Sequence, residues 1–335
     1  MRSARPGETL TVQLGGALGD DFTAVGATLN VESGSVGSGA EVANSEVNVS
    51  GGEIGSFFEA FAGSTVNISG GTVGESFGAE NGSTVNITEG TVGNGFDANN
   101  GSEVNISGGS VGDGFGANSG SEVNISGGSV GDVFDANSGS EVNISGGSVG
   151  DGFQAEFGST VNISGGTVGS NLFALGGTVS ISGGTVGSDF FALGSTVNIS
   201  GGTVGSNFQA GGSTVNITGG AFGNDFNAAY GSTVNLFGTE FFLNGSLVDT
   251  LTLGEPFTIF DRGEDVVLSG VFADGTLFDF DLIPNLSLFY SLDFFDPSST
   301  LTITRVAAIP EPGCGLTLAT MSLVLLVRRR RRALH

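Results

Sequence analysis

Short alternations of apolar and polar residues recur along most of the chain, and a pair of glycines follows each one. One unit reads TVNISGGTVGESFGAENGS, from Thr65 to Ser83. In this unit Val66 and Ile68 alternate with polar neighbours, which is the period of a half-buried β-strand. The first valine recurs at a nearly constant spacing, at Val47, Val66, Val85, Val104, Val123, Val142, Val161, Val179, Val197, Val215 and Val234. A short, regular period of this kind is typical of solenoids.

Each unit predicts a coil with three short sides and five inward side chains. In the unit above these are Val66 and Ile68, then Val73, then Phe77 with Ala79. The glycine pair allows a sharp corner, because glycine adopts positive φ without steric cost. We therefore predict an all-β parallel β-helix with 18–19 residues per coil over residues 29–236, preceded by a degenerate N-terminal coil or cap at 1–28.

Coils stacked about 4.8 Å apart would place equivalent residues directly above one another. The inward phenylalanine column contains Phe58, Phe77, Phe96, Phe115, Phe134, Phe153, Phe190, Phe208 and Phe226, with Leu172 as the exception. An outward asparagine column contains Asn48, Asn67, Asn86, Asn105, Asn124, Asn143, Asn162, Asn198, Asn216 and Asn235, with Ser180 as the exception. We expect the amides to hydrogen-bond from coil to coil.

The repeat ends after Asn235, and conventional β-alternation takes over. The Asp274-Gly275 pair between two apolar stretches indicates a hairpin. We predict a small β-rich C-terminal cap over residues 237–306, because a solenoid end otherwise exposes an unpaired strand edge.

Charge narrows the choice of partners. The chain has 34 acidic and 9 basic residues, and five of the basic ones are Arg328 to Arg332, which leaves 4 basic against 34 acidic over residues 1–327. Such a surface repels nucleic acid, so we expect no nucleic-acid partner. Cys314 is the only cysteine, so no disulfide forms within the chain; we interpret it as a small apolar helix residue, with lipidation as the alternative.

The repeats contain few side chains that could take part in catalysis. They contain no Lys, Arg or His between Leu29 and Val234, and His335 is the only histidine of the chain. A polysaccharide lyase needs a basic side chain and a glycosidase needs a carboxylate pair. We therefore expect a non-enzymatic protein with no catalytic residues.

Carboxylates nevertheless gather in three successive coils, where Asp113, Asp132 and Asp151 share one repeat position. A second column contains Glu103, Glu122 and Glu141. Stacked like charges repel, so either solvent screens them or a cation lies between them. We interpret these carboxylates as a solvated acidic surface. The string GGSVGDGFG resembles the calcium-binding nonapeptide of RTX toxins, which makes the three aspartates a candidate calcium site as the alternative, and a catalytic role is the third reading. We expect no other cofactor.

The glycine-rich repeat as a whole resembles the β-helical repeats of large secreted bacterial adhesins of the filamentous haemagglutinin type. The resemblance covers residues 29–236 and lies in spacing and composition. It implies surface adhesion by analogy of fold.

The tail carries the most specific motif. Pro310-Glu311-Pro312 precedes an apolar run from Gly313 to Val327, and the arginine cluster Arg328, Arg329, Arg330, Arg331 and Arg332 follows. Residues 307–335 closely resemble the PEP-CTERM sorting signal of Gram-negative bacteria. That resemblance implies an exosortase as processing enzyme, a transmembrane helix in the inner membrane and an association with exopolysaccharide. The arginines would hold their end of the helix in the cytoplasm.

These observations predict an exported, non-enzymatic structural or adhesion protein, membrane-anchored by its tail and then found at the cell surface or in the extracellular matrix. The alternative is a carbohydrate-binding or carbohydrate-active β-helix acting on exopolysaccharide through its carboxylate columns. The Thr and Asn columns also resemble an ice-binding face, although glutamates interrupt it. The N-terminus MRSARPGETL lacks the apolar segment of a signal peptide, so we expect the true start to lie upstream of Met1.

Overall fold

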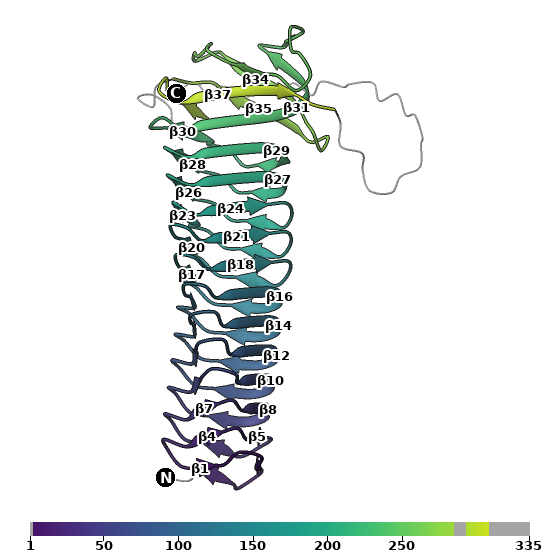
Figure 1. Cartoon of the computed structure of the whole chain (residues 1–335). Helices are drawn as coiled ribbons and strands as arrows, with labels where there is room; N and C mark the ends of the chain where they lie inside the picture. The colour runs from purple at the N-terminus through teal and green to yellow at the C-terminus, as the bar shows by residue number, and fades with distance from the viewer. Residues whose placement is uncertain (1–2, 285–292, 308–335) are drawn as a thin grey trace, which may run out of the picture.

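The computed structural model describes residues 3–284 and 293–307, and all regular structure in these residues is β. The chain winds into a parallel β-solenoid of about 12 turns. Its coils stack into a rod with the N-terminus at one end and the C-terminal strands at the other (Figure 1). The predicted all-β parallel solenoid is confirmed.

Two arrays of strands run along the rod, and the strands of successive coils pair in parallel. Sheet A contains one short strand from each coil, namely β1 (Ser3–Ala4), β4 (Thr23–Val25), β7 (Glu41–Ala43), β9 (Glu59–Ala60), β11 (Gly78–Ala79), β13 (Asp97–Ala98), β15 (Gly116–Ala117), β17 (Asp135–Ala136), β20 (Gln154–Ala155), β23 (Phe173–Leu175), β26 (Phe190–Leu193), β28 (Phe208–Gly211), β30 (Asn227–Ala229) and β36 (Phe294–Phe295). Sheet B contains β2 (Thr9–Val12), β3 (Ala17–Leu18), β5 (Thr28–Val31), β6 (Ser35–Val36), β8 (Glu46–Ile54), β10 (Thr65–Val73), β12 (Thr84–Val92), β14 (Glu103–Val111), β16 (Glu122–Val130), β18 (Glu141–Ile144), β19 (Ser148–Val149), β21 (Thr160–Ile163), β22 (Thr167–Val168), β24 (Thr178–Ile181), β25 (Thr185–Val186), β27 (Thr196–Val204), β29 (Thr214–Phe222), β31 (Thr233–Leu243), β32 (Ser246–Leu247), β33 (Pro256–Thr258), β34 (Val267–Phe272), β35 (Leu277–Asp281) and β37 (Thr300–Arg305).

The coils are in register. In β10, Val66 pairs with Val47 of the preceding coil and with Val85 of the next. The two short strands expected around the glycine pair are one bent strand in many coils, with a shift of register at the bend. At such a bend, a Cβ on Gly127 would lie 2.3 Å from the Ser107 carbonyl oxygen of the preceding coil, so only glycine fits there.

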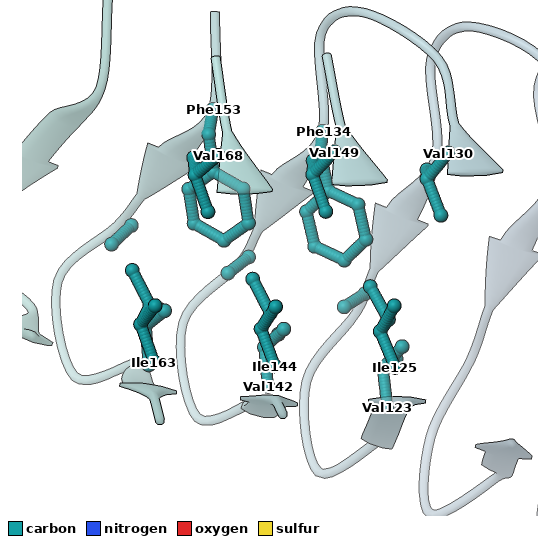
Figure 2. Packing of buried hydrophobic residues seen from close by; sticks show 14 of the residues in the cluster. Val123, Ile125, Val130, Phe134, Val142, Ile144, Val149, Phe153, Ile163 and Val168 are labelled. Atoms are coloured by element: carbon teal, nitrogen blue, oxygen red, sulfur yellow. The ribbon is translucent and has the colours of Figure 1, made fainter. Parts of the chain in front are cut away.

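The core is a continuous column of apolar side chains, and the five predicted inward positions are buried along the rod, except that Phe222 is partly buried. From Phe58 to Phe153 the successive ring centroids lie 4.6–5.0 Å apart, which is the spacing of the strands themselves. Figure 2 shows Phe134 and Phe153 packed against valines and isoleucines of their own and adjacent coils. Each buried Phe, Val or Ile contributes roughly 1.5–3 kcal/mol, so these columns are the main force holding coils together.

A sixth inward position was not predicted. The serine that ends most coils is buried, at Ser45, Ser64, Ser83, Ser102, Ser121, Ser140, Ser159, Ser195, Ser213, Ser232 and Ser299. The Ser121 hydroxyl donates to the Asn118 carbonyl at 2.6 Å, and Ser140 and Ser159 repeat this bond. In these three coils the serine closes the circuit with a tight turn and satisfies a part-buried carbonyl, whereas the hydroxyls of Ser83, Ser102 and Ser232 are buried without a hydrogen-bond partner among the described residues.

The asparagine ladder is confirmed. Asn67 donates to Asn48 at 2.9 Å, Asn86 donates to Asn67 at 2.9 Å, and the same bond recurs along the rod. The amides form two runs, one on each side of Ser180. At the C-terminal end the ladder continues from Asn235 to the Thr302 hydroxyl.

The parallel stack extends beyond the boundary predicted at residue 236. Strand β37 pairs in parallel with β31, with Thr233 opposite Thr300, and β36 pairs with β30. The last coil is therefore interrupted by a long insertion. Within this insertion β34 and β35 form an antiparallel hairpin around Asp274-Gly275, as predicted, and β34 pairs with the end of β31.

The predicted transmembrane helix belongs to the C-terminal tail. The apolar run from Gly313 to Val327 lies outside the described residues. Within residues 3–284 and 293–307, no helix is long and apolar enough to cross a membrane.

Candidate functional site

The three predicted metal-ligating aspartates lie at one corner of consecutive coils, and their side chains bond to the backbone. The Asp132 amide donates to Asp113 Oδ1 at 2.9 Å, and the Asp151 amide donates to Asp132 Oδ1 at 2.9 Å. The series continues to the Ser170 amide, which donates to Asp151 at 2.7 Å. Each carboxylate thus fastens the corner of the next coil.

The same corner uses asparagine elsewhere, because Asn94 Oδ1 accepts from the Asp113 amide at 3.0 Å. A neutral amide and a carboxylate therefore perform the same structural role at this position. Among the residues that the structure describes, no group of three or more His, Cys, Asp or Glu side chains could hold a metal ion. Calcium binding at Asp113, Asp132 and Asp151 stays a prediction.

The glutamate column on sheet B bonds within its own strands. Glu103, Glu122 and Glu141 are exposed at the start of their strands. Each accepts a hydrogen bond from the asparagine two residues later, at 2.9, 3.1 and 3.4 Å. These carboxylates support the asparagine ladder and point outward.

Sheet A carries a third set of carboxylates on its outer face. Glu59, Asp97 and Asp135 occupy one column, and Gly78 and Gly116 lie between them. The glycines keep these three carboxylates two coils apart, which is about 10 Å, whereas Glu41 lies directly opposite Glu59 in the preceding coil. Burial is the main cause that raises the pKa of all three carboxyls, and neighbouring glutamates raise it further.

Beyond this acidic stretch the outer face of sheet A becomes apolar. We define the apolar platform as the side chains of Phe173, Leu175, Phe191 and Leu193, with Phe157 and Tyr230 at its two ends. Phe173 and Phe191 are half-buried and stack with ring centroids 5.2 Å apart. The other four side chains are 36–86% exposed.

The apolar platform was missed in the sequence, although one signal marks it. Each of the three coils that begin at Thr160, Thr178 and Thr196 is one residue shorter than the six coils directly before them. In these coils β23, β26 and β28 of sheet A have three or four residues, whereas the sheet A strands β9, β11, β13, β15, β17 and β20 have two. Sheet A is thus wider where the outward side chains are apolar.

Concave sites are shallow in the described part of the chain. The larger of the two best-formed depressions has a volume of about 470 Å³, and it is an open, glycine-lined surface near the N-terminal end. Glu53 is the only ionisable residue lining it. A single carboxylate without an acid or base partner does not form a catalytic site.

The predicted sorting residues Pro310, Glu311 and Pro312, the arginines Arg328 to Arg332, and Cys314 lie outside the described residues. No protein-family model, curated protein or solved structure matches this chain. Any functional assignment therefore rests on the chain's own residues.

Proposed function

We propose that the protein is an exported, non-enzymatic rod that contributes to adhesion or matrix structure at the cell surface. The observation that carries this proposal is the use of the repeated polar side chains. Asparagines and corner aspartates bond to neighbouring coils, and the outward glutamates accept bonds from the asparagines of their own strands. Such an array is suited to a rigid spacer and offers no grouped acid, base or nucleophile for catalysis.

The tail supplies the proposed route to the surface. Its Pro310-Glu311-Pro312 motif, apolar run and arginine cluster resemble a PEP-CTERM signal. The motif follows closely on Arg305, the last residue of β37, so an exosortase cutting there would release an essentially complete rod. Until then the apolar run would hold the rod at the inner membrane, with the arginines on the cytoplasmic side.

The C-terminal β region, residues 237–306, serves in this proposal as a cap. Strand β33 lies antiparallel to β37 and covers part of the outer edge of the last coil. It has three residues and begins with Pro256, and both features make it a poor template for a further strand. The cap would therefore limit end-to-end association of rods.

Export and sorting are tested together on cells. The chain is fused to a secretion leader, tagged in the turn at Gly245 and expressed in a Gram-negative host that contains an exosortase. We expect the tag to be accessible to protease on intact cells, or shed into the medium. A Pro310→Ala/Pro312→Ala variant should stay in the inner membrane. Recovery of the parent chain in the cytosol would refute the proposal.

A second candidate function is carbohydrate binding, and the apolar platform favours it over carbohydrate cleavage. Exposed aromatic side chains are typical of binding faces, whereas cleavage needs a carboxylate pair or a base. Release of reducing sugars from exopolysaccharide by the purified chain would contradict the non-enzymatic assignment.

A further inference from the structure

The apolar platform is a local departure from an otherwise regular repeat. The outward column that contains Phe173 and Phe191 carries Gln154 in the preceding coil and Gln209 in the following one. In the parallel column, Leu175 and Leu193 replace the asparagines of earlier coils, such as Asn118 and Asn137. Because these side chains face outward, the core does not require them to be apolar.

Small residues under the platform leave room between its large ones. The Phe157 ring lies over Gly176, where an added Cβ would be 2.8 Å from Phe157 Cδ2. Leu193 and Tyr230 flank Gly211, at 2.9 and 3.6 Å from the position of an added Cβ. The surface is thus a row of apolar side chains with a dip at Gly211.

Amide groups border the rings. Gln209 Nε2 donates to Asn207 Oδ1 at 2.8 Å, and Asn207 in turn donates to Asp189. This network fixes the Gln209 amide beside the Phe191 ring. Asn227 Oδ1, in the next coil of the same column, is buried without a hydrogen-bond partner among the described residues. Rings bracketed by oriented amides offer both stacking and hydrogen bonding to a ligand.

Charge and area restrict what covers this face. The chain carries a net charge of −25, which disfavours a second copy, an anionic lipid surface and an anionic polysaccharide. Four coil spacings from Phe157 to Tyr230, by a four-residue strand, give a platform of roughly 20 by 13 Å, or about 260 Å². A stable protein interface needs about 800 Å² on each partner. The platform is therefore too small for a stable dimer and unsuited to an anion.

We propose that the apolar platform binds a neutral glycan chain. The apolar C–H faces of successive sugar rings lie on Phe173, Phe191 and Tyr230, and the hydroxyls bond to the Gln209 amide. The extended row of rings suits a linear polymer rather than a single sugar. The inference deepens the proposed surface role by naming a ligand class, and it rests on that role only for its biological setting.

Affinity electrophoresis of the full chain, in a detergent without a sugar headgroup, tests the proposal. The gels contain hydroxyethylcellulose, dextran, galactomannan or, as an anionic comparison, polygalacturonate. We expect at least one neutral polymer to retard the chain and polygalacturonate to have no effect. The Phe173→Gln/Phe191→Gln variant, which extends the natural column of Gln154 and Gln209, should bind about tenfold more weakly or not at all.

A matched control removes an exposed phenylalanine far from the platform. Phe57 is 62% exposed, and Ser76 occupies its position in the next coil. Phe57→Ser should keep full retardation, and circular dichroism should show both variants folded. Equal binding by parent and double variant, or no retardation by any neutral polymer, would overturn the proposal.

Self-association is measured on the same samples. A parent chain that sediments as a dimer, together with a monomeric Phe173→Gln/Phe191→Gln variant, would show that the platform joins two copies and would overturn glycan binding. These measurements use purified protein, so a failure here leaves export and sorting untouched, and a cytosolic location on cells would leave the binding result standing.

Discussion

At the scale of single residues, one corner is strained by a side chain that its neighbours avoid. Val133 has φ 60° at a position where Gly114 and Gly152 have φ 73° and 78°. A β-branched residue is a genuine outlier in this region, where an L-residue costs roughly 1–2 kcal/mol. Val133 is also 48% exposed, so it gains little from burial.

Replacing Val133 by glycine should therefore stabilise the rod. We expect Val133→Gly to raise the free energy of unfolding by about 0.5–1 kcal/mol, since relief of strain exceeds the entropy cost of glycine. Urea unfolding compares the variant with the parent. Val130→Gly, at a buried inward position of the same coil, is the contrasting change and should destabilise it. Equal stability of Val133→Gly and the parent would show that the corner is relaxed.

Substitutions in the phenylalanine column should instead destabilise the rod. Phe115 is fully buried between Phe96 and Phe134, with ring centroids 4.8 Å away on both sides. Phe115→Ala should lower the free energy of unfolding by about 3–5 kcal/mol through lost burial and a cavity. Phe115→Leu should cost less, because Leu172 occupies the same column naturally. Thermal melts of both variants measure the difference.

Asp293 links the C-terminal region to pH. Its carboxyl accepts hydrogen bonds from the Phe226 and Asp281 amides, but burial dominates and raises its pKa to about 6. The folded pKa lies above the unfolded one, so the stabilising contribution is complete below about pH 4 and is lost as the pH rises through about 6.

We therefore expect the C-terminal region to be less stable at neutral than at mildly acidic pH. The Asp293 contribution should amount to at most ~3 kcal/mol. Urea unfolding across this range measures it in the parent and in Asp293→Asn, which carries no titrating group at this position. A pH dependence that is identical in the two proteins would contradict the assignment to Asp293.

At the scale of elements, variants of the corner aspartates can show whether these side chains hold adjacent coils together or bind a metal ion. Because Asn94 performs the same role as the aspartates, Asp132→Asn should change stability by less than about 0.5 kcal/mol. Asp132→Ala removes the acceptor of the Asp151 amide and should cost about 1 kcal/mol. Urea unfolding of the parent and of both variants is measured with and without calcium. A calcium-dependent stabilisation of the parent that Asp132→Asn abolishes would favour the metal site.

Most elements were predictable because one spacing recurs. The spacing of the valines from Val47 to Val234 gives the length of each coil. The columns of Phe and Asn then follow from stacking the coils in register. The buried serines were missed because a serine after a glycine is typical of an exposed turn, and its burial depends on the closure of the whole circuit. The platform was missed because Phe190-Phe191 does not reveal which ring faces outward.

At the scale of the whole molecule, the end of the rod was harder to predict than its body. The insertion breaks the 18–19-residue period, so the partners of β36 and β37 lie 67 residues earlier in the chain. The stretch Ser299-Thr300-Leu301 does match the Ser-Thr-Val that begins other coils, and this is the signal that could have revealed the last coil. Its partner Thr233 lies far earlier in the chain, on the other side of the whole insertion.

This long separation has a consequence for how the rod assembles. Within the body, a new coil needs only the residues that directly follow the preceding coil, so growth can follow the chain as it emerges and no distant segment is awaited. The final circuit alone must close a much larger loop, at an added entropic cost of about 1 kcal/mol. It is therefore the last part to form, and until it does, the newest coil keeps an open edge.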